Sequence, residues 1–198
     1  MLYKLAHILR DRLGFVWNMV EWLNALVFAA MHKKQLAKIP EILHEFSDRF
    51  TLREAALTDV APLAKFFADQ SEDAFKFFKP HEFDEKTLTR IIRNRAFLTF
   101  LVLDGETLVG YFFLRCFVNG KCFRGRIVDY RWRNKGIAKK MGLVMNEIVS
   151  LLRMRLFGSI SPDNYASLQS TKAVNDIRII KTLDNGYYYI EYLPKRGA

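Results

Sequence analysis

The chain has 198 residues, of which 51% are hydrophobic and 26% charged, with 10 glycines and 5 prolines. This composition excludes a disordered or collagen-like chain and provides enough apolar side chains for one domain with an appendage. Lys and Arg outnumber Asp and Glu by 31 to 21, and the net charge of +10 indicates an anionic partner: nucleic acid, a membrane surface or a phosphorylated small molecule.

The first 46 residues differ from the rest of the chain. The run from Leu13 to Met31 contains one charged residue, Glu21, and its pattern predicts a helix that is apolar around most of its circumference. The run is shorter than the roughly 20 apolar residues of a membrane span, and basic residues flank both of its ends. Three interpretations stay open: the helix packs on its own domain or on a second subunit, lies in a membrane interface, or spans the bilayer. We therefore divide the chain into a helical extension over 1–46 and a domain over 49–198.

Within the domain, helical and extended patterns alternate. The predicted helices are 58–69, 85–95, 136–152 and 164–174, and the predicted strands are 50–54, 97–103, 107–118, 122–130, 154–160, 176–183 and 187–193. Three turn dipeptides predict hairpins, because both central positions of a type I′ turn need positive φ: Asp104-Gly105, Asn119-Gly120 and Asn185-Gly186.

The turn at Asn119-Gly120 also bears on the two cysteines. A two-residue loop there would pair Cys116 with Phe123, and directly opposed residues share a face of the sheet. We therefore expect Cys116 and Cys122 on opposite faces, as free thiols in a reducing compartment. The four histidines are scattered and have no zinc-site spacing, so we predict no metal site.

The basic excess concentrates in residues 115–155, which carry eleven Lys and Arg and two acidic residues. In this stretch an apolar strand ends at Val128, a basic turn follows, and a helix begins near Gly136. The unpaired N–H groups at a helix N-terminus bind phosphate readily. Four side chains would add positive charge beside such a phosphate: Arg133, Lys135, Lys139 and Lys140. An ordinary strand-turn-helix with solvated basic residues fits the spacing equally well.

These residues resemble the GCN5-related N-acetyltransferases, the GNAT superfamily. The acyl-CoA signature of that family, Arg/Gln-x-x-Gly-x-Gly/Ala between the fourth strand and the third helix, is matched by Arg133-x-x-Gly136-x-Ala138. The resemblance extends to Asn164, where the family has an Asn that opens the next helix, and to the small residue Ser167 three positions later. The order of elements agrees across about 49–193, whereas residues 1–46 have no counterpart in the minimal family fold.

The resemblance implies a mixed α/β fold. Its central sheet would have six to seven mostly antiparallel strands, splayed in the middle, with helices on both faces and the N-terminal helical extension added. The pantetheine arm of acetyl-CoA, or of another acyl-CoA, would lie in the splay, and the pyrophosphate would lie on the turn. The cofactor-binding residues expected from this arrangement are Ile127, Val128, Arg133, Asn134, Lys135, Gly136, Ile137, Ala138, Asn164 and Ser167.

The implied activity is direct transfer of the acyl group to a primary amine, as in an acyl-CoA-dependent N-acetyltransferase. Where many family members have a Tyr that protonates the departing thiolate, this chain has Thr171. Where the family often has an acidic base on the fourth strand, Arg124 and Gly125 stand instead, and the nearest carboxylate, Asp129, fits a turn cap equally well. The candidate catalytic residues are therefore Asp129, Thr171 and, by its location alone, His81. Water is the alternative proton acceptor.

In this fold the acceptor site lies between the first helical pair and the last hairpin. Residues 75–84 and 187–189 would form an aromatic wall with carboxylates there, which suits a cationic or sugar-like amine, free or glycan-linked. Simple packing of the phenylalanines between helices is the other interpretation.

Several alternatives to an enzyme stay open. They are a CoA-binding protein without activity, an interaction protein docked on a membrane through residues 13–31, and a nucleic-acid-binding protein. The last is disfavoured because no helix-turn-helix, zinc or RNP-like motif accompanies the basic stretch. A homodimer is also open. We expect a cytoplasmic location, with peripheral attachment at the inner membrane face as a further alternative.

Overall fold

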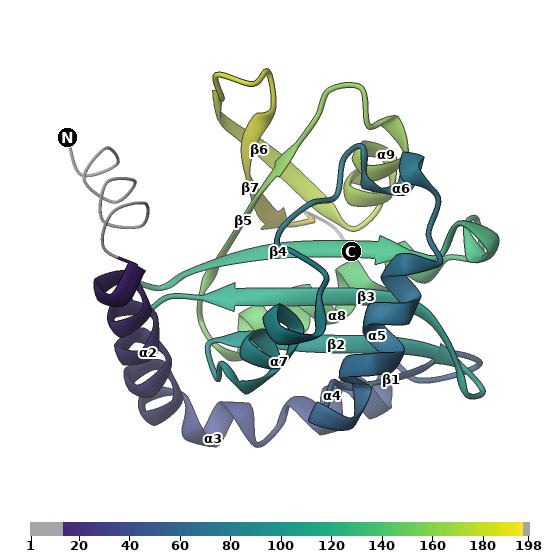
Figure 1. Cartoon of the computed structure of the whole chain (residues 1–198). Helices are drawn as coiled ribbons and strands as arrows, with labels where there is room; N and C mark the ends of the chain where they lie inside the picture. The colour runs from purple at the N-terminus through teal and green to yellow at the C-terminus, as the bar shows by residue number, and fades with distance from the viewer. Residues whose placement is uncertain (1–13, 196–198) are drawn as a thin grey trace.

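The computed structural model describes residues 14–195 (Figure 1). The helices before the sheet core are α2 (Gly14–Met31), α3 (Lys33–Leu36) and α4 (Ile39–Glu45), and those within the domain are η1 (Leu57–Asp59), α5 (Val60–Ala68), α6 (Glu72–Phe75), α7 (Glu85–Arg93), η2 (Tyr130–Trp132), α8 (Ile137–Leu151) and α9 (Tyr165–Lys172). The strands are β1 (Thr51–Glu54), β2 (Phe97–Asp104), β3 (Thr107–Cys116), β4 (Lys121–Val128), β5 (Arg155–Ile160), β6 (Asn175–Thr182) and β7 (Tyr188–Pro194). The predicted order of helices and strands is confirmed.

The strands form one seven-stranded sheet in the order β1-β2-β3-β4-β5-β7-β6. Every neighbouring pair is antiparallel except β4 and β5, which are parallel. Their pairing is short, because it covers only Lys121 to Phe123 against Arg155 to Phe157. Beyond Phe123 and Phe157 the two strands separate. The predicted splayed, mostly antiparallel sheet is confirmed.

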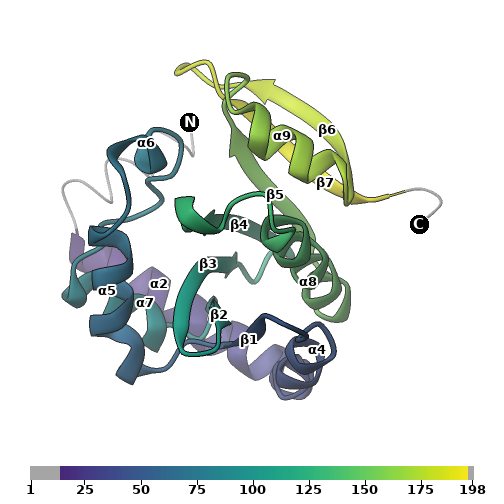
Figure 2. The ribbon, with the colours of Figure 1, turned by 90° about the vertical axis from the view of Figure 1, so that its right-hand side faces the viewer.

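Helices cover both faces of this sheet (Figure 2). On one face α5 and α7 bury Leu63, Phe67 and Leu88 against the aromatic side chains of β3. On the other face α8 buries Met141, Val144 and Met145, and the N-terminal helices contribute to this second core with the buried side chains Phe28, Ile39 and Leu43. Residues from both sides of position 46 therefore share one hydrophobic core.

The hairpin between β3 and β4 differs from the sequence prediction. Phe117 N–H donates to the carbonyl of Lys121 (2.9 Å), and Cys116 pairs with Cys122, so the loop holds three residues instead of two. Gly120 supplies the positive φ of +77° at the end of this loop. Because one added loop residue shifts the register by one, the expectation that the cysteines lie on opposite faces is wrong. Both are free and buried, with their sulfur atoms 3.3 Å apart.

Apart from Phe28 and Ala29 near its end, helix α2 presents most of its large apolar side chains to solvent. Its polar side chains face the domain: Asn24 Nδ2 donates to the carbonyl of Cys116 (3.0 Å), Val118 N–H donates to Asn24 Oδ1 (3.1 Å), and Arg115 pairs with Glu21 (2.5 Å). The exposed large apolar side chains of the helix are Met19, Val20, Trp22, Leu23, Leu26, Val27 and Met31. None of the helices in the described part of the chain is long and apolar enough to cross a bilayer.

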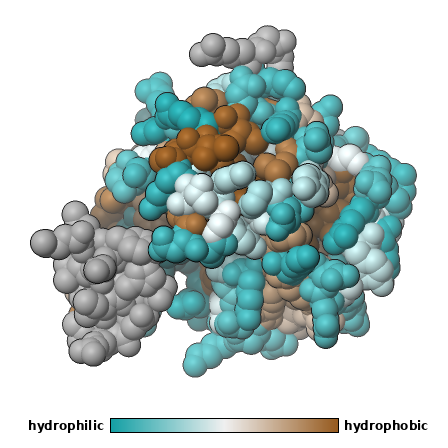
Figure 3. Space-filling view, turned by 90° about the horizontal axis from the view of Figure 1, so that it is seen from above, coloured by the Kyte–Doolittle hydropathy of each residue, from teal (hydrophilic) through white to brown (hydrophobic). Residues whose placement is uncertain are grey.

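Strand β6 is the outer strand at the end of the sheet that lies at the top of Figure 1. It carries two exposed isoleucines, Ile179 and Ile180. Seen from above, the surface is mostly hydrophilic and has one prominent hydrophobic patch (Figure 3). The pairing of β6 with β7 shifts between Ile179 and Lys181, and a bulge of this kind disfavours the addition of another strand at the edge.

Candidate active site

A cleft of about 680 Å³ begins where β4 and β5 separate. One wall comes from α8, α9 and the turn before α8, and the opposite end is lined by Asp73, Phe77 and Phe78. In Figure 2, α6 lies on the opposite side of β4 from α8 and α9. Nine of the ten predicted cofactor-binding residues line this cleft: Ile127, Val128, Arg133, Asn134, Gly136, Ile137, Ala138, Asn164 and Ser167. The tenth, Lys135, does not line it.

The turn at the outer end of the cleft leaves backbone N–H groups free. Asn134 and Gly136 both have positive φ, +63° and +78°, and this reverses the chain so that α8 begins at Ile137. Lys140 N–H donates to the Gly136 carbonyl (3.0 Å) as the first intrahelical bond, so the amides of the first helical turn have no helical partner. A Cβ at Gly136 would meet nothing within 4 Å. The turn is therefore an open cradle of amides.

Two of the four predicted phosphate-side cations are turned to other partners. Lys140 pairs with Asp48 (2.5 Å), and the Lys135 Nζ lies 4.0 Å from the centre of the Trp132 ring. Arg133 and Lys139 line the cleft. The positive end of the α8 dipole adds to their charge at this end.

Asn164 begins α9, as the resemblance implies. Its Oδ1 accepts a hydrogen bond from Ser167 N–H (3.1 Å), which caps the helix. Both residues line the cleft on its α9 side. 

At the inner end of the cleft, two arginines project from one side of β4. Arg124 is 9% exposed; it donates to Asn175 Oδ1 and Thr171 Oγ1, each at 3.2 Å, and its guanidinium lies 3.4 Å from the centre of the Tyr192 ring. Arg126 donates to the Ala138 carbonyl, to Ser170 Oγ (2.8 Å) and to Thr171 Oγ1 (3.2 Å). Burial, together with the neighbouring charge of Arg124, lowers the pKa of Arg126 to about 9.

Thr171 is fully buried beneath these two guanidiniums. A hydroxyl has two lone pairs and one proton, and both lone pairs of Thr171 face arginine donors. These two bonds do not use its own proton, and Thr171 also lines the cleft. Sequence reasoning named Thr171 but missed Arg126, Ser170 and Tyr192 as its surroundings. The alternation Arg124-Gly125-Arg126 was the available signal, since it places both arginines on one face of the strand.

The other two candidate catalytic residues lie outside the cleft lining. Asp129 is fully buried and accepts from Arg131 N–H (2.8 Å), the Arg131 guanidinium (2.6 Å) and Gln70 Nε2 (3.3 Å). The hydrogen bonds from Arg131, offset in part by burial, hold the pKa of Asp129 below its usual range. This arrangement fits the turn-capping interpretation.

His81 lies among aromatic side chains of the core that α5 and α7 form with β3. Its Nδ1 faces the Glu82 carbonyl (2.7 Å), and its Nε2 faces the hydroxyl of the buried Tyr111 (3.0 Å). Burial lowers the pKa of His81. In the neutral ring Nδ1–H donates to the carbonyl and Nε2 accepts from the tyrosine.

The predicted aromatic wall divides into two parts. Phe77 and Phe78 line the cleft beside Asp73, whereas Phe83 stacks on Phe67 with ring centres 4.1 Å apart. From the last strand it is Tyr192, rather than residues 187–189, that reaches the cleft. The aromatic-wall interpretation therefore applies to Phe77 and Phe78, and the packing interpretation applies to Phe83.

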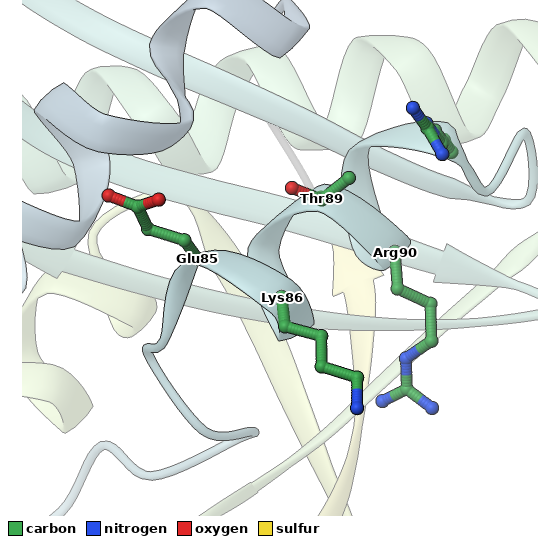
Figure 4. Close-up of a pocket in the computed structure, with 5 residues that line it drawn as sticks. Glu85, Lys86, Thr89 and Arg90 are labelled. Carbon is green, nitrogen blue, oxygen red and sulfur yellow. The ribbon is translucent and has the colours of Figure 1, made fainter.

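A second depression, of about 570 Å³, lies on α7 (Figure 4). Its described lining comes from this one helix: Glu85, Lys86, Thr89, Arg90 and Arg93. Figure 4 shows the labelled side chains spread along the outer surface of the helix without converging on a point. Among residues 14–195 no cluster of three or more His, Cys, Asp or Glu has the arrangement of a metal site.

Comparison with solved structures identifies the fold. The ribosomal-protein-S5-alanine acetyltransferase from Vibrio fischeri superposes with a TM-score of 0.60 at 11% identity, covering 76% of this chain and 96% of that chain. The GNAT domain of S. lividans PAT gives 0.62 at 12% identity, with 72% and 89% covered. Aminoglycoside acetyltransferase AAC(6')-Ib, in complex with coenzyme A and kanamycin, gives 0.59 at 13% identity, with 74% and 95% covered. No protein-family model and no curated protein matches the sequence. The chain has the GNAT acyltransferase fold.

Proposed function

We propose that the protein is an N-acyltransferase that moves an acetyl or other acyl group from acyl-CoA to a primary amine. The observation that carries this proposal is that the separation of β4 from β5 and the open amide cradle at the start of α8 belong to one cleft. Solved proteins of the same fold include complexes with CoA or acetyl-CoA, such as Mycobacterium smegmatis RimJ with CoA-disulfide. An inactive CoA-binding relative is the alternative, and turnover separates the two.

The residues present fit acyl-CoA. The unpaired amides of the α8 turn, with Arg133 and Lys139, would hold the pyrophosphate. The backbone of β4 from Arg124 to Val128 has no partner in β5, so it can accept the pantetheine arm as an added strand. Asn164 and Ser167 would face this arm from α9. When bound, acyl-CoA supplies an acyl group already activated as a thioester.

Thr171 is the residue that we assign to the leaving group. Because its Oγ1 accepts from the two arginines, its O–H would be available to donate a hydrogen bond to the sulfur as negative charge develops there. In the reaction the amine nitrogen bonds to the acyl carbon as the carbon–sulfur bond breaks. The amine gives up one proton to water and the thiolate takes one up. Asp73 and the aromatic rings at the far end of the cleft would orient a cationic amine, free or carried on a glycan.

Two measurements test the function. Calorimetry with acetyl-CoA should show 1:1 binding in the micromolar range, and release of free thiol should then rise when the right amine is supplied from a panel of polyamines, aminoglycosides and amino sugars. Binding without turnover on any amine would favour the inactive relative. Absence of binding would contradict the proposal.

Helix α2 supports a second role, attachment to an anionic membrane surface. Its apolar side chains face outward, with Trp22 63% exposed, and Lys33, Lys34 and Lys38 are exposed just beyond the helix. A helix with an apolar face next to lysines binds an interface by burying the apolar face among lipid head groups while the lysines attract anionic lipid. Such attachment would hold the enzyme beside membrane-linked acceptors.

Co-sedimentation of the full chain with phosphatidylserine-containing vesicles tests this role. We expect binding that weakens with salt and falls at least about tenfold in the double variant Trp22→Glu, Leu26→Glu. Ile179→Glu, at a similarly exposed apolar position on β6, should bind vesicles normally. If the chain instead forms a dimer that the same double variant breaks, measured by light scattering, the apolar face is a contact between two copies and the membrane role is wrong.

A further inference from the structure

Toward the inner end of the cleft lie one buried guanidinium, Arg124, and one half-buried guanidinium, Arg126, and the described residues place no anion beside either. Every recorded hydrogen-bond acceptor of Arg124 and Arg126 is neutral: an amide oxygen, two hydroxyls and one backbone carbonyl. Among residues 14–195, no carboxylate forms an ion pair with either arginine. By contrast, the other buried ionic group of this sheet, Glu191, is paired with both Arg155 and Arg178.

An unpaired buried guanidinium is costly, because removal from water is not offset by attraction to a counter-charge. Two of them side by side also repel each other. The glycine at position 142 on α8 leaves space for the Arg126 guanidinium, because a Cβ there would lie only 3.1 Å from it. A ligand that brings a carboxylate to this point would supply the missing charge and could accept bidentate hydrogen bonds from a guanidinium.

The position of the pair indicates which part of a ligand would carry that carboxylate. Arg124 is the first residue of β4 beyond its last pair with β5, so it lies at the apex of the splay. Val128, beside the amide cradle, is four residues away, about 13 Å along a strand. With the pyrophosphate on the cradle and the arm running along β4, the thioester end would come to the apex, next to Thr171 and Arg124. Pantetheine itself is neutral and cannot pair with a guanidinium.

We infer that the preferred donor is the CoA thioester of a dicarboxylic acid, of malonyl or succinyl size, whose free carboxylate binds Arg124 and Arg126. This inference rests on the proposed function, since it uses the same cleft and the same orientation of the donor. It replaces the neutral acetyl group by an acyl chain that ends in a negative charge. The product would be an amide that carries a carboxylate where the acceptor had an amine.

The acceptor is the other conceivable source of a carboxylate. Both arginines, however, project to the side of the sheet occupied by α8 and α9, where they contact Ala138, Ser170 and Thr171. The far end of the cleft, on the α6 side, is lined by Asp73 and two phenylalanines, which favour a cation. The structure therefore assigns the carboxylate to the donor.

The test compares thioesters that differ only in the terminal carboxylate. Calorimetry on the unmodified full chain measures Kd for succinyl-CoA against butyryl-CoA, and for malonyl-CoA against propionyl-CoA. We expect at least one dicarboxylic thioester to bind tenfold or more tightly than its neutral isostere. Equal affinities within twofold in both pairs would overturn the inference while leaving the proposed function intact. Failure of every thioester, and of CoA itself, to bind would contradict the proposed function instead.

Variants connect the preference to the arginines. In Arg124→Gln, the dicarboxylic thioester and its neutral isostere should bind with dissociation constants that differ by no more than about twofold. The control Arg95→Gln removes the same charge from an exposed loop and should keep the tenfold difference. Because Arg124 is buried, folding of each variant is checked by its thermal unfolding, and Arg124→Lys, which keeps a cation, should retain part of the preference. A ratio unchanged in folded Arg124→Gln would overturn the inference.

A final arm distinguishes the two sources of carboxylate. With saturating acetyl-CoA, thiol release is measured with glycine and with glycine methyl ester as acceptors. We expect no advantage for glycine. An advantage that disappears in Arg124→Gln would place the carboxylate on the acceptor and overturn the assignment to the donor.

Discussion

The two ends of the cleft are built on different principles. At the outer end the binding groups are backbone amides on a positive-φ turn, and the cations Arg133 and Lys139 only add to them. At the inner end the binding groups are side chains, with Arg124, Arg126 and Thr171 held in one buried hydrogen-bond network. The outer end can bind any phosphate in reach, whereas the inner end discriminates by charge and geometry.

This difference teaches where specificity and affinity arise. Amide groups at a helix N-terminus are supplied by the backbone, so most substitutions nearby leave them in place. A buried network fails as a unit, because loss of one member leaves its partners without hydrogen bonds. We therefore expect changes at the inner end to act mainly on turnover and donor choice, and changes at the outer end to act on affinity for CoA.

The largest expected effect is on turnover in Thr171→Val. This change keeps the shape of the side chain but removes the O–H that faces the leaving group, so kcat should fall about 100-fold with little change in KM. Thr171→Ser is the matched control and should keep most of the activity. Steady-state thiol release measures both. A KM effect larger than the kcat effect would show that Thr171 only shapes the cleft.

At the outer end, Gly136→Glu should weaken binding of acetyl-CoA at least about tenfold. A Cβ at Gly136 would meet no atom within 4 Å and Gly136 lines the cleft, so the added carboxylate would place a negative charge beside the pyrophosphate. Gly105→Glu is the matched control, because Gly105 also has positive φ, +59°, and open space around it, but lies in the β2–β3 hairpin. Calorimetry that finds both variants equal to the unmodified protein would contradict the placement of the pyrophosphate.

The smallest expected effect concerns His81, which touches neither end of the cleft. Burial lowers its pKa in the folded protein, so as the pH falls through about 6.5 the unfolded chain takes up the proton first and stability drops. The loss is at most about 1.4 kcal/mol per pH unit. Urea unfolding between pH 7 and pH 5 should show this slope, and His81→Gln should flatten it.

The opposite result at His81 is also informative. If His81→Gln leaves the slope unchanged but lowers kcat, the histidine acts on the acceptor as an acid or base, and the cleft has a third functional region.

Much of the fold followed from local patterns. The alternation of helices and strands and the order of elements depend on neighbours in the chain, and these predictions are confirmed from Thr51 to Pro194. The three glycine turns join hairpins as predicted, but in each dipeptide only the glycine has positive φ, so the expected type I′ geometry is wrong. The cradle at Gly136 is local in the same way, because the strand, the turn and the helix that form it are consecutive. Nine of the ten residues predicted from it and from the resemblance line one cleft.

The predictions about the cysteines and about the orientation of α2 fell short for one reason: residue spacing alone does not reveal contacts between distant segments. One residue in the loop after Cys116 decided whether its side chain met Cys122. Which side of α2 faces the domain also depends on distant groups. Asn24 forms hydrogen bonds with the backbone of Cys116 and Val118, so the polar side of the helix faces inward.

By itself, the sequence determined which segments form helices and strands and where the backbone offers unpaired amides, since both are consequences of local conformation. Only the tertiary structure decided that two arginines of β4 meet the hydroxyl of Thr171 from α9 and have no carboxylate partner within residues 14–195. The physical reason is that the charge balance of a buried site depends on every element that surrounds it. Five segments surround this one: β4, α8, α9, β6 and β7.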